Sequence, residues 1–242
     1  MKLRYLHRAY KARYRDQKAE VLASLAALKP GDTAVDVGGN KGAYTYWLRK
    51  AVGDTGRVFV FEPQPALARY LESVVAAMKW ANVTVGDCAL SDSVGTATLH
   101  VPGEKDSPGA SLEPVAAEGG VSNLHQCRVD TLDRQLQNAG RVALLKVDVE
   151  GHELNVFRGG VQTIERHRPV IIFECEARHL SRNTMQDVFG FLKGLGYSGE
   201  FFSTDGLKPL SEFNPAVHQK QTGPRFWDAP DYCNNFLFRP AK

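Results

Sequence analysis

Residues 33–45 constrain the fold of this chain more than any other segment. They read Thr-Ala-Val-Asp-Val-Gly-Gly-Asn-Lys-Gly-Ala-Tyr-Thr, so short apolar residues around Asp36 are followed by glycines and then by an amphipathic stretch. This order predicts a buried strand, a glycine turn and a helix. Glycines permit positive φ and a close approach of a ligand, and free amides at a helix start favour a polar or anionic group. The segment therefore predicts a ligand site, because a charge such as that of Asp36 is costly inside an apolar strand.

A second acid supports a nucleotide-like ligand. Glu62 lies twenty residues after Gly42, at the end of the strand predicted for residues 57–61. In nucleotide-binding α/β folds, an acid at this place accepts hydrogen bonds from ribose hydroxyls. The dinucleotide fingerprint would need glycine at two positions that hold Asn40 and Ala43. The site therefore resembles the S-adenosylmethionine site of class I methyltransferases more than a pyrophosphate cradle.

Length and composition indicate one α/β domain. The chain has 242 residues, of which 43% are hydrophobic and 24% charged, as in globular proteins. A net charge of +3 does not indicate general nucleic-acid binding, and no apolar run reaches the length of a membrane span or a signal-peptide core. The four cysteines lack C-x-x-C spacing, which argues against zinc and favours a reducing, cytoplasmic compartment.

Residues 1–28 are predicted to form a basic helical arm ahead of the main domain at 29–242. The first eighteen residues hold seven Lys or Arg and a single acid, Asp16. Apolar residues at helical spacing predict a stripe that packs on the domain, and these residues are Leu3, Leu6, Tyr10 and Tyr14. The alternative is a basic surface that attracts an acidic substrate or anionic lipid head groups, a peripheral membrane contact.

The third predicted strand, residues 82–85, ends just before Asp87 and Cys88. In a doubly wound sheet the end of this strand borders the adenine pocket, so both residues are candidates for contacts with the adenine edge. An ordinary polar turn explains the same residues.

Two later segments are predicted to cover the substrate. Residues 96–101 and 126–129 have the composition of an antiparallel hairpin, and the long loop 102–125 between them is predicted to act as a lid. Its Ser111 is the expected polar contact with the substrate. A loop rich in proline and aromatic residues near the C-terminus, which includes Trp227, is expected to wall off the pocket.

Charged residues gather where two further strands end. Lys146, Asp148 and Glu150 alternate along and just beyond the strand predicted for residues 143–149, and Glu174 follows the next strand. Open α/β sheets bind ligands at these carboxyl ends. Such a group is costly to bury without a function, although an ion network that compensates itself would also explain it.

Five sequence blocks together resemble one family. The blocks are Val-Asp-Val-Gly-Gly-Asn-Lys-Gly-Ala-Tyr-Thr, Val-Phe-Glu-Pro, Ala-Leu-Ser-Asp, Leu-Lys-Val-Asp-Val-Glu-Gly-His-Glu and the Phe-Glu pair at 173–174. They are similar to those of the FkbM family of S-adenosylmethionine-dependent methyltransferases. The resemblance implies a doubly wound, Rossmann-like sheet of seven strands, six of them parallel and one antiparallel. It also implies O-methylation of a hydroxyl, or sometimes a carboxylate, of a sugar, glycan or natural product.

The resemblance assigns roles to individual residues of the chain. Residues of the glycine segment would hold the methionine end of S-adenosylmethionine, namely Asp36, Gly38, Gly39, Asn40, Gly42 and Thr45. Glu62 would bind the ribose, and Asp87 and Cys88 would meet the adenine. Asp148 would lie beside the reacting sulfonium.

Methyl transfer to a neutral alcohol needs a base that takes the hydroxyl proton. His152 and Glu150 are the first candidates, because Asp148 is expected to be engaged with the cofactor, and Glu174 is a further one. Lys146 is expected to orient these carboxylates or to steady a developing oxyanion.

A catalytic metal is not expected. Asp148 and Glu174 leave the ends of adjacent strands, as Mg²⁺ ligands do in catechol-type methyltransferases, and hard cations prefer oxygen ligands. However, Lys146 offers partial charge compensation, and the sequence shows no third ligand.

Two functions of other classes stay open at this stage. A nicotinamide-dependent oxidoreductase would use the same sheet and Glu62, but the glycines missing at positions 40 and 43 count against it. A non-catalytic glycan-binding module would keep the aromatic loop without needing the acids at the strand ends. The acceptor and the oligomeric state are left open.

Overall fold

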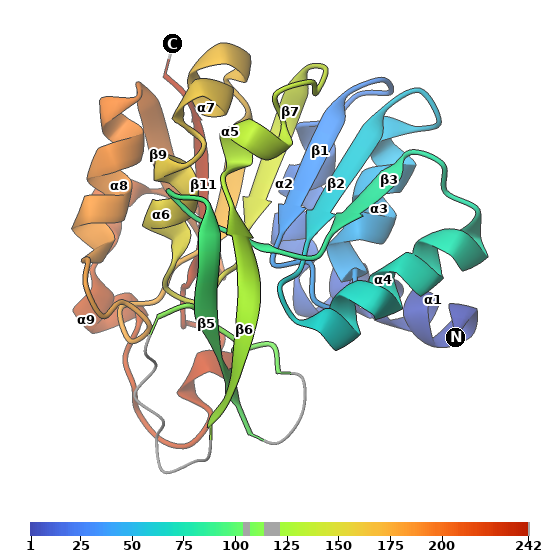
Figure 1. Ribbon diagram of the computed structural model, residues 1–242. Helices are drawn as coiled ribbons and strands as arrows, with labels where there is room; N and C mark the ends of the chain where they lie inside the picture. Colours follow the sequence, from blue (N-terminus) through green and yellow to red (C-terminus); the bar gives the residue numbers. More distant parts are fainter. Residues whose placement is uncertain (104–106, 114–121, 242) are drawn as a thin grey trace.

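The computed structural model describes residues 1–103, 107–113 and 122–241. A central sheet is covered by helices on both faces, and a second, smaller sheet stands beside its lower end (Figure 1). In the described residues the central sheet has eight strands in the order β10-β9-β11-β8-β7-β1-β2-β3. Their bounds are β1 Thr33–Val37, β2 Arg57–Phe61, β3 Val83–Gly86, β7 Val142–Val147, β8 Val170–Glu174, β9 Tyr197–Ser203, β10 Gly206–Pro209 and β11 Asn235–Pro240.

The strand directions confirm the doubly wound fold. Strands β3, β2, β1, β7 and β8 pair in parallel, and β11 lies antiparallel between β8 and β9. The expected number of seven strands was too low, because β10 pairs antiparallel with β9 as an edge strand. The sequence of β10, Gly-Leu-Lys-Pro, ends in proline and gives a weak strand signal, since proline is confined to edges and ends of sheets.

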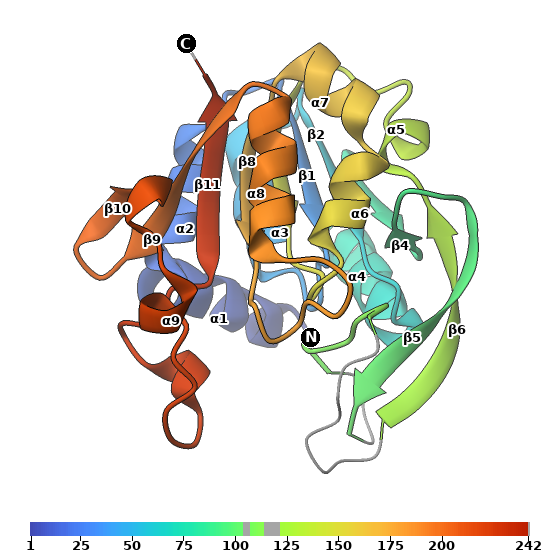
Figure 2. The same cartoon turned by 90° about the vertical axis from the view of Figure 1, so that its left-hand side faces the viewer.

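Two apolar layers enclose the sheet. On one face, Leu48 and Val52 of helix α3 (Ala43–Val52) pack with Val58 of β2. On the other face, helices α6 (Glu153–Arg158), α7 (Val161–His167) and α8 (Met185–Gly194) cover the strands. Figure 2 shows these three helices in front of the sheet, with α2 (Lys18–Ala26) and α3 behind it. Beyond the N-terminal arm, the other helices of the described residues are α4 Pro65–Met78, α5 Leu132–Gln135 and α9 Pro215–His218, with 3₁₀ turns at Leu210–Glu212 and Phe226–Asp228.

The second sheet contains the predicted hairpin. Strand β5 (Gly95–Pro102) pairs antiparallel with β6 (Ser122–Asp130), and β4 (Ala89–Leu90) pairs in parallel with β6. The hairpin prediction is therefore confirmed. Of the loop predicted as a lid, the parts 104–106 and 114–121 lie outside the described residues. The part 107–113 bonds to Gln64, Glu150 and His152, in the segments that follow the strand ends.

The N-terminal arm is helical, and its predicted packing stripe is confirmed for Tyr10 and Tyr14, whose rings lie 5.2 and 6.0 Å from the ring of Trp47, but not for Leu3. It consists of α1 (Lys2–Lys11), a π-helical turn (Ala12–Asp16) and α2 (Lys18–Ala26). Its buried side in α1 carries Tyr5 and Ala9, whereas Leu3 is 84% exposed and Tyr14 62% exposed. The reason is tertiary: the Tyr5 hydroxyl donates to the carbonyl of Gly42, and the indole N–H of Trp47 donates to the carbonyl of Ala9.

Candidate active site

A cavity of about 560 Å³ opens at the carboxyl ends of β1, β2, β7 and β8. Cavities of about 300–1,000 Å³ accommodate small organic ligands. Its wall combines apolar side chains, such as Phe61 and Leu90, with a few polar groups. Of the residues predicted for the site, the wall includes Gly38, Asn40, Glu62, Cys88, Ser111, Asp148, Glu150, His152, Glu174 and Trp227.

The glycine turn after β1 is shaped by its neighbours. Gly38 has φ +80°, and a Cβ there would lie 1.8 Å from the carbonyl oxygen of Asp148. The turn therefore requires glycine so that the ends of β1 and β7 can meet. Asn40 follows with φ +46°, and its N–H donates to Oε2 of Glu62 over 2.8 Å.

Glu62 forms the polar end of the cavity near β2. Its side chain is 3% exposed, and Oε1 accepts from both the backbone N–H and the side-chain amide of Gln64. Burial raises the pKa of Glu62, and the hydrogen bonds from Gln64 and Asn40 oppose this rise. A carboxylate has about four acceptor positions, so three donors leave room for one ribose hydroxyl.

Gln64 is a cavity residue that the sequence reasoning missed. Its side-chain amide donates to the carbonyl of Ser107, and its Oε1 accepts from the N–H of the same residue. Gln64 thus holds the described part of the β5–β6 loop against Glu62. Its place directly before Pro65, at the start of α4, was the signal available in the sequence.

Other predicted cofactor residues lie outside the cavity wall. Asp36 is buried behind the glycine turn and accepts from the Thr45 hydroxyl over 2.8 Å. A Cβ on Gly39 would collide with Val60. Gly42 has φ +74°. Burial raises the pKa of Asp36, and the charge of Lys146 opposes this. These residues support the turn from beneath.

Asp87 is also outside the cavity wall. Its side chain is 69% exposed and lies 3.5 Å from Arg128, whereas Cys88 is fully buried and lines the cavity. The end of β3 therefore turns Cys88, and not Asp87, toward the predicted adenine pocket.

Lys146 and Asp148 form a half-buried ion pair at the end of β7. The Lys146 ammonium, 2% exposed, donates to Oδ2 of Asp148 over 2.9 Å and lies 4.9 Å from the centre of the Tyr44 ring. Burial lowers the pKa of Lys146, but the charges of Asp148 and Asp36 outweigh it and raise the pKa overall. Lys146 is therefore charged and orients Asp148, as the sequence predicted for one of its two roles.

Glu150 has a strained backbone and a histidine neighbour. Its φ is +54°, and Oε2 lies 2.6 Å from Nδ1 of His179. Burial raises the pKa of Glu150, which makes its carboxylate a stronger base than an exposed one. His179 was missed, although it follows Glu174 and Glu176 closely in the sequence.

Glu176 supports this pair from below. It accepts two hydrogen bonds from the Arg178 guanidinium and one from the Tyr232 hydroxyl. Burial raises the pKa of Glu176, but these donors outweigh it and lower the pKa to about 2. Glu176 therefore stays ionised next to His179.

His152 is enclosed by partners on both ring nitrogens. Nδ1 lies 2.9 Å from Oε1 of Glu113, and Nε2 lies 2.9 Å from the Ser91 hydroxyl. Because a carboxylate only accepts, Nδ1 carries the proton and Nε2 accepts from Ser91. Glu113, which also accepts from Ser181, was missed because it belongs to the long loop. The arrangement leaves His152 less able than Glu150 to take a substrate proton directly.

Ser111 and Trp227 reach the cavity in different ways. The Ser111 hydroxyl donates to the carbonyl of Glu150 over 2.5 Å and accepts from the N–H of Glu113. It therefore shapes the Glu150 backbone. Trp227 is 43% exposed and packs with Phe226 and the Arg178 guanidinium at the cavity rim.

The structure supplies the third oxygen ligand that the sequence lacked. Asp148, Glu150 and Glu174 bring one carboxylate oxygen each within 4.8 Å of one another, and a second group brings together one oxygen each of Glu150 and Glu176 and a ring nitrogen of His179. Oxygen-rich groups of this kind suit divalent cations. Burial, with the charges of Asp148 and Glu150, raises the pKa of Glu174 well above its usual range.

Within the described residues, no helix is both long and apolar enough to cross a membrane.

Comparisons with known proteins agree with this geometry. The family profile described as Methyltransferase FkbM domain matches residues 36–198. "Methyltransferase 1" of Beauveria bassiana (strain ARSEF 2860) is 28% identical over 145 residues, which cover 52% of this chain and 57% of that protein. The chain thus spans little more than half the length of this relative.

Solved structures share the fold at low identity. A methyltransferase FkbM from Methylobacillus flagellatus KT superposes with a TM-score of 0.53 at 17% identity, over 87% of this chain and 43% of the other. An rRNA-methylase, described as putative, from Clostridium thermocellum superposes with a TM-score of 0.51 at 13% identity, over 92% and 94%. These likenesses show a class I, Rossmann-like methyltransferase fold.

Proposed function

The chain belongs to the FkbM methyltransferase family, and from this premise we propose that it is an S-adenosylmethionine-dependent O-methyltransferase. The acceptor would be a hydroxyl of a small molecule, such as a sugar, glycan or natural product. The observation that carries the proposal is a single cavity that has Glu62 at one end and Asp148 and Glu150 at the other. One end suits a ribose, and the other suits a reacting hydroxyl.

The residues present fit the cofactor. Glu62 has an acceptor position left for a ribose hydroxyl, and the apolar side chains of Phe61, Cys88 and Leu90 offer a slot for a flat aromatic base. Gly38 borders the cavity beside Asp148, and Asn40 borders it beside Glu62. When bound, S-adenosylmethionine supplies a methyl group on a positively charged sulfur.

Glu150 is proposed as the base. Its carboxylate lines the cavity, its pKa is raised by burial, and His179 lies beside Oε2. A base whose pKa approaches the working pH removes a hydroxyl proton most effectively. The proton would pass from the acceptor hydroxyl to the carboxylate of Glu150, while the Lys146 ammonium holds the Asp148 carboxyl in place.

The charge of the cavity favours a neutral acceptor. Asp148, Glu150 and Glu174 all line the same end, so an acceptor carboxylate would meet like charge there. A hydroxyl avoids this repulsion and can donate a hydrogen bond to Glu150. Trp227 at the rim offers an apolar face against which a ring-shaped acceptor can pack.

The four cysteines are free and buried, which supports the cytoplasm as the place of action.

Titration calorimetry with S-adenosylmethionine and S-adenosylhomocysteine tests the proposal first. Micromolar binding is expected, weakened by about tenfold in Glu62→Gln, the loss of roughly one charged hydrogen bond. Glu165→Gln, which changes an exposed acid on α7, is the matched control and should bind as the wild type does. Methyl transfer from labelled cofactor to a panel of glycosides and phenols then identifies the acceptor. Binding of NAD in place of either methyl compound would contradict the proposal.

A further inference from the structure

The side of the N-terminal arm that faces solvent carries apolar groups. Leu3 is 84% exposed, Tyr14 62%, Met1 57% and Tyr10 45%. Leu3, Tyr10 and Tyr14 follow one another at helical spacing. Leu3 stands clear of the domain, whereas the Tyr10 and Tyr14 rings rest on Trp47 at 5.2 and 6.0 Å and expose their outer edges. Isolated exposed apolar residues are common, but a row of them along one helix face marks a contact surface.

Cations border this row. Lys2, Arg4 and Lys11 are exposed beside it. The single acid among the first eighteen residues, Asp16, is compensated by Lys11 and Arg15 at 3.0 and 2.8 Å. We call Leu3, Arg4, Tyr10, Lys11 and Tyr14, with Lys2, the outer face of the arm.

The positive charge of the chain is concentrated in the arm. The first eighteen residues have seven of the 30 Lys and Arg and one of the 27 Asp and Glu, so the rest of the chain has 23 against 26. The arm is therefore strongly basic on a body that is slightly acidic. Such an asymmetry orients a protein toward an anionic surface.

Helix α1 is held on the domain by side-chain hydrogen bonds, so the outer face exists before a partner binds. The Tyr5 hydroxyl donates to the Gly42 carbonyl over 2.9 Å, and Trp47 donates to the Ala9 carbonyl over 2.7 Å. The guanidinium of Arg8 donates to the Tyr70 hydroxyl on α4. Because the helix is already docked on the domain, binding through its outer face does not have to order it first.

From these observations we propose that the outer face of the arm binds the surface of a lipid bilayer that contains anionic lipids. Leucine inserts between acyl chains, tyrosine rings favour the headgroup level, and lysine and arginine meet anionic head groups. A nucleic acid would pair with the cations, but it would leave Leu3 exposed to water.

The bound bilayer lies next to the cavity. Asp16 and Gln17, between the two helices of the arm, line the cavity together with Trp227 and Asp228. Figure 1 shows α1 on the right, below the lower ends of β1 and β2, toward which these strands run. Membrane binding itself does not depend on the proposed methyl transfer, so either proposal can fail alone.

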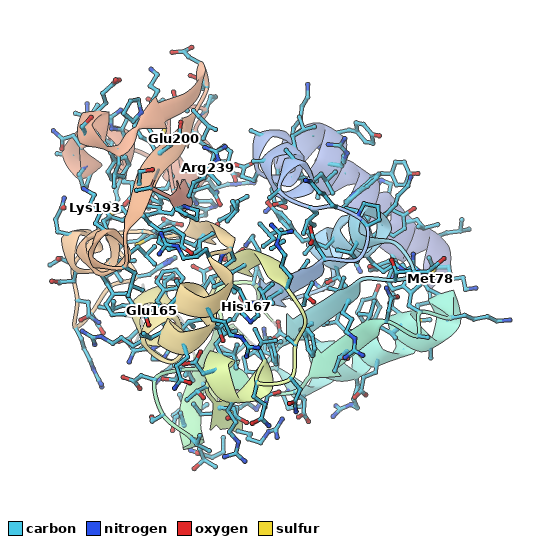
Figure 3. All side chains as sticks on the ribbon, turned by 90° about the horizontal axis from the view of Figure 1, so that it is seen from above. Met78, Glu165, His167, Lys193, Glu200 and Arg239 are labelled. Atoms are coloured by element: carbon cyan, nitrogen blue, oxygen red, sulfur yellow. The ribbon has the colours of Figure 1, made fainter. Side chains whose placement is uncertain are left out.

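Vesicle co-sedimentation of the full chain tests the proposal. The probes are vesicles of phosphatidylcholine alone and of phosphatidylcholine with phosphatidylserine, at low and high salt. The variants are Lys2→Glu/Arg4→Glu, which reverses two outer-face charges, and Leu3→Gln, which removes the most exposed apolar group. The matched control is Arg166→Glu/Lys193→Glu, which makes the same change of charge on exposed positions of α7 and α8. Figure 3 shows Lys193 on the opposite side of the molecule from Met78, the last residue of α4.

We expect the wild type to bind only the anionic vesicles and to bind more weakly at high salt. The outer-face charge variant should lose at least about tenfold in affinity, and Leu3→Gln should lose about threefold, while the control retains binding. Circular dichroism confirms that each variant is folded. Equal loss in the control, equal binding to both vesicle types, or tighter binding of a single-stranded RNA probe through the same charges would overturn the proposal.

Discussion

Two glutamate and histidine pairs flank the cavity, and they differ in how their polar atoms are satisfied. In the first, His152 is enclosed between Glu113 and Ser91, and Glu113 also accepts from Ser181. In the second, Glu150 lines the cavity beside His179 at 2.6 Å. The first pair joins the long loop to the segment after β7, whereas the second presents a carboxylate to the ligand space. The same two residue types thus link two segments of the chain in the first pair, whereas in the second pair the glutamate is the proposed base.

The largest effect is expected for Glu150→Gln. Loss of the base should lower kcat by about 10²–10⁴-fold and leave the affinity for S-adenosylhomocysteine nearly unchanged. Steady-state kinetics and calorimetry measure the two quantities. If His152→Gln lowers kcat as much while Glu150→Gln remains active, the roles of the two pairs are reversed.

Glu153, the buried first residue of α6, gives a test through stability in place of activity. Burial raises its pKa to about 8, and its Oε1 accepts from the N–H of Gly151. An acid whose pKa is raised in the folded state stabilises the fold below its ordinary pKa, and this stability is lost as the pH rises toward 8. The free energy of unfolding of the wild type should therefore fall by up to roughly 4 kcal/mol between about pH 5 and pH 9 because of Glu153. Glu153→Gln should not show this fall. Urea unfolding at several pH values measures it, and parallel curves for both proteins would contradict the assignment.

The smallest effects are expected where Glu113 is altered, because its carboxylate bonds to His152 and Ser181 away from the proposed chemistry. Glu113→Gln removes the charge of this carboxylate. The variant should lose roughly 1–3 kcal/mol in unfolding free energy and keep most of its kcat. Burial raises the pKa of Glu113, but hydrogen bonds from Ser181 and His152 outweigh it and lower the pKa. The stability from this carboxylate is therefore present above its ordinary pKa and is lost as the pH falls through the lowered value. Ser181→Ala, which removes one donor, should show a smaller loss of the same sign.

The strand ends were predictable because their signals are local. An acid within or just after a buried strand occurs at Asp36, Glu62, Asp148 and Glu174, and parallel strands bring such ends to one edge. This placed Glu62, Asp148, Glu150 and Glu174 correctly at one cavity. It did not show that Asp36 faces the interior behind the turn, because that depends on the Thr45 hydroxyl and on how α3 packs.

Partners from distant segments were beyond sequence reasoning. Glu113 lies 39 residues before His152 and joins it only when the hairpin folds onto the sheet. Asn234 lies 60 residues after Glu174 and donates to it from the segment before β11. The protonation of each carboxylate depends on such neighbours, so the choice between His152 and Glu150 required the structure.

The sequence by itself determined the doubly wound sheet, the glycine turn and the acids at the strand ends, since these follow from the periodicity of short segments. Tertiary structure alone decided which face of the arm is buried. Helical spacing made Leu3, Tyr10 and Tyr14 the apparent packing stripe. The bonds of Tyr5 to Gly42 and of Trp47 to Ala9 bury another side of the helix instead, so Leu3 faces solvent, and Tyr10 and Tyr14 reach the Trp47 ring while staying partly exposed. A helix with apolar groups on more than one side has its orientation selected by the surface that receives it.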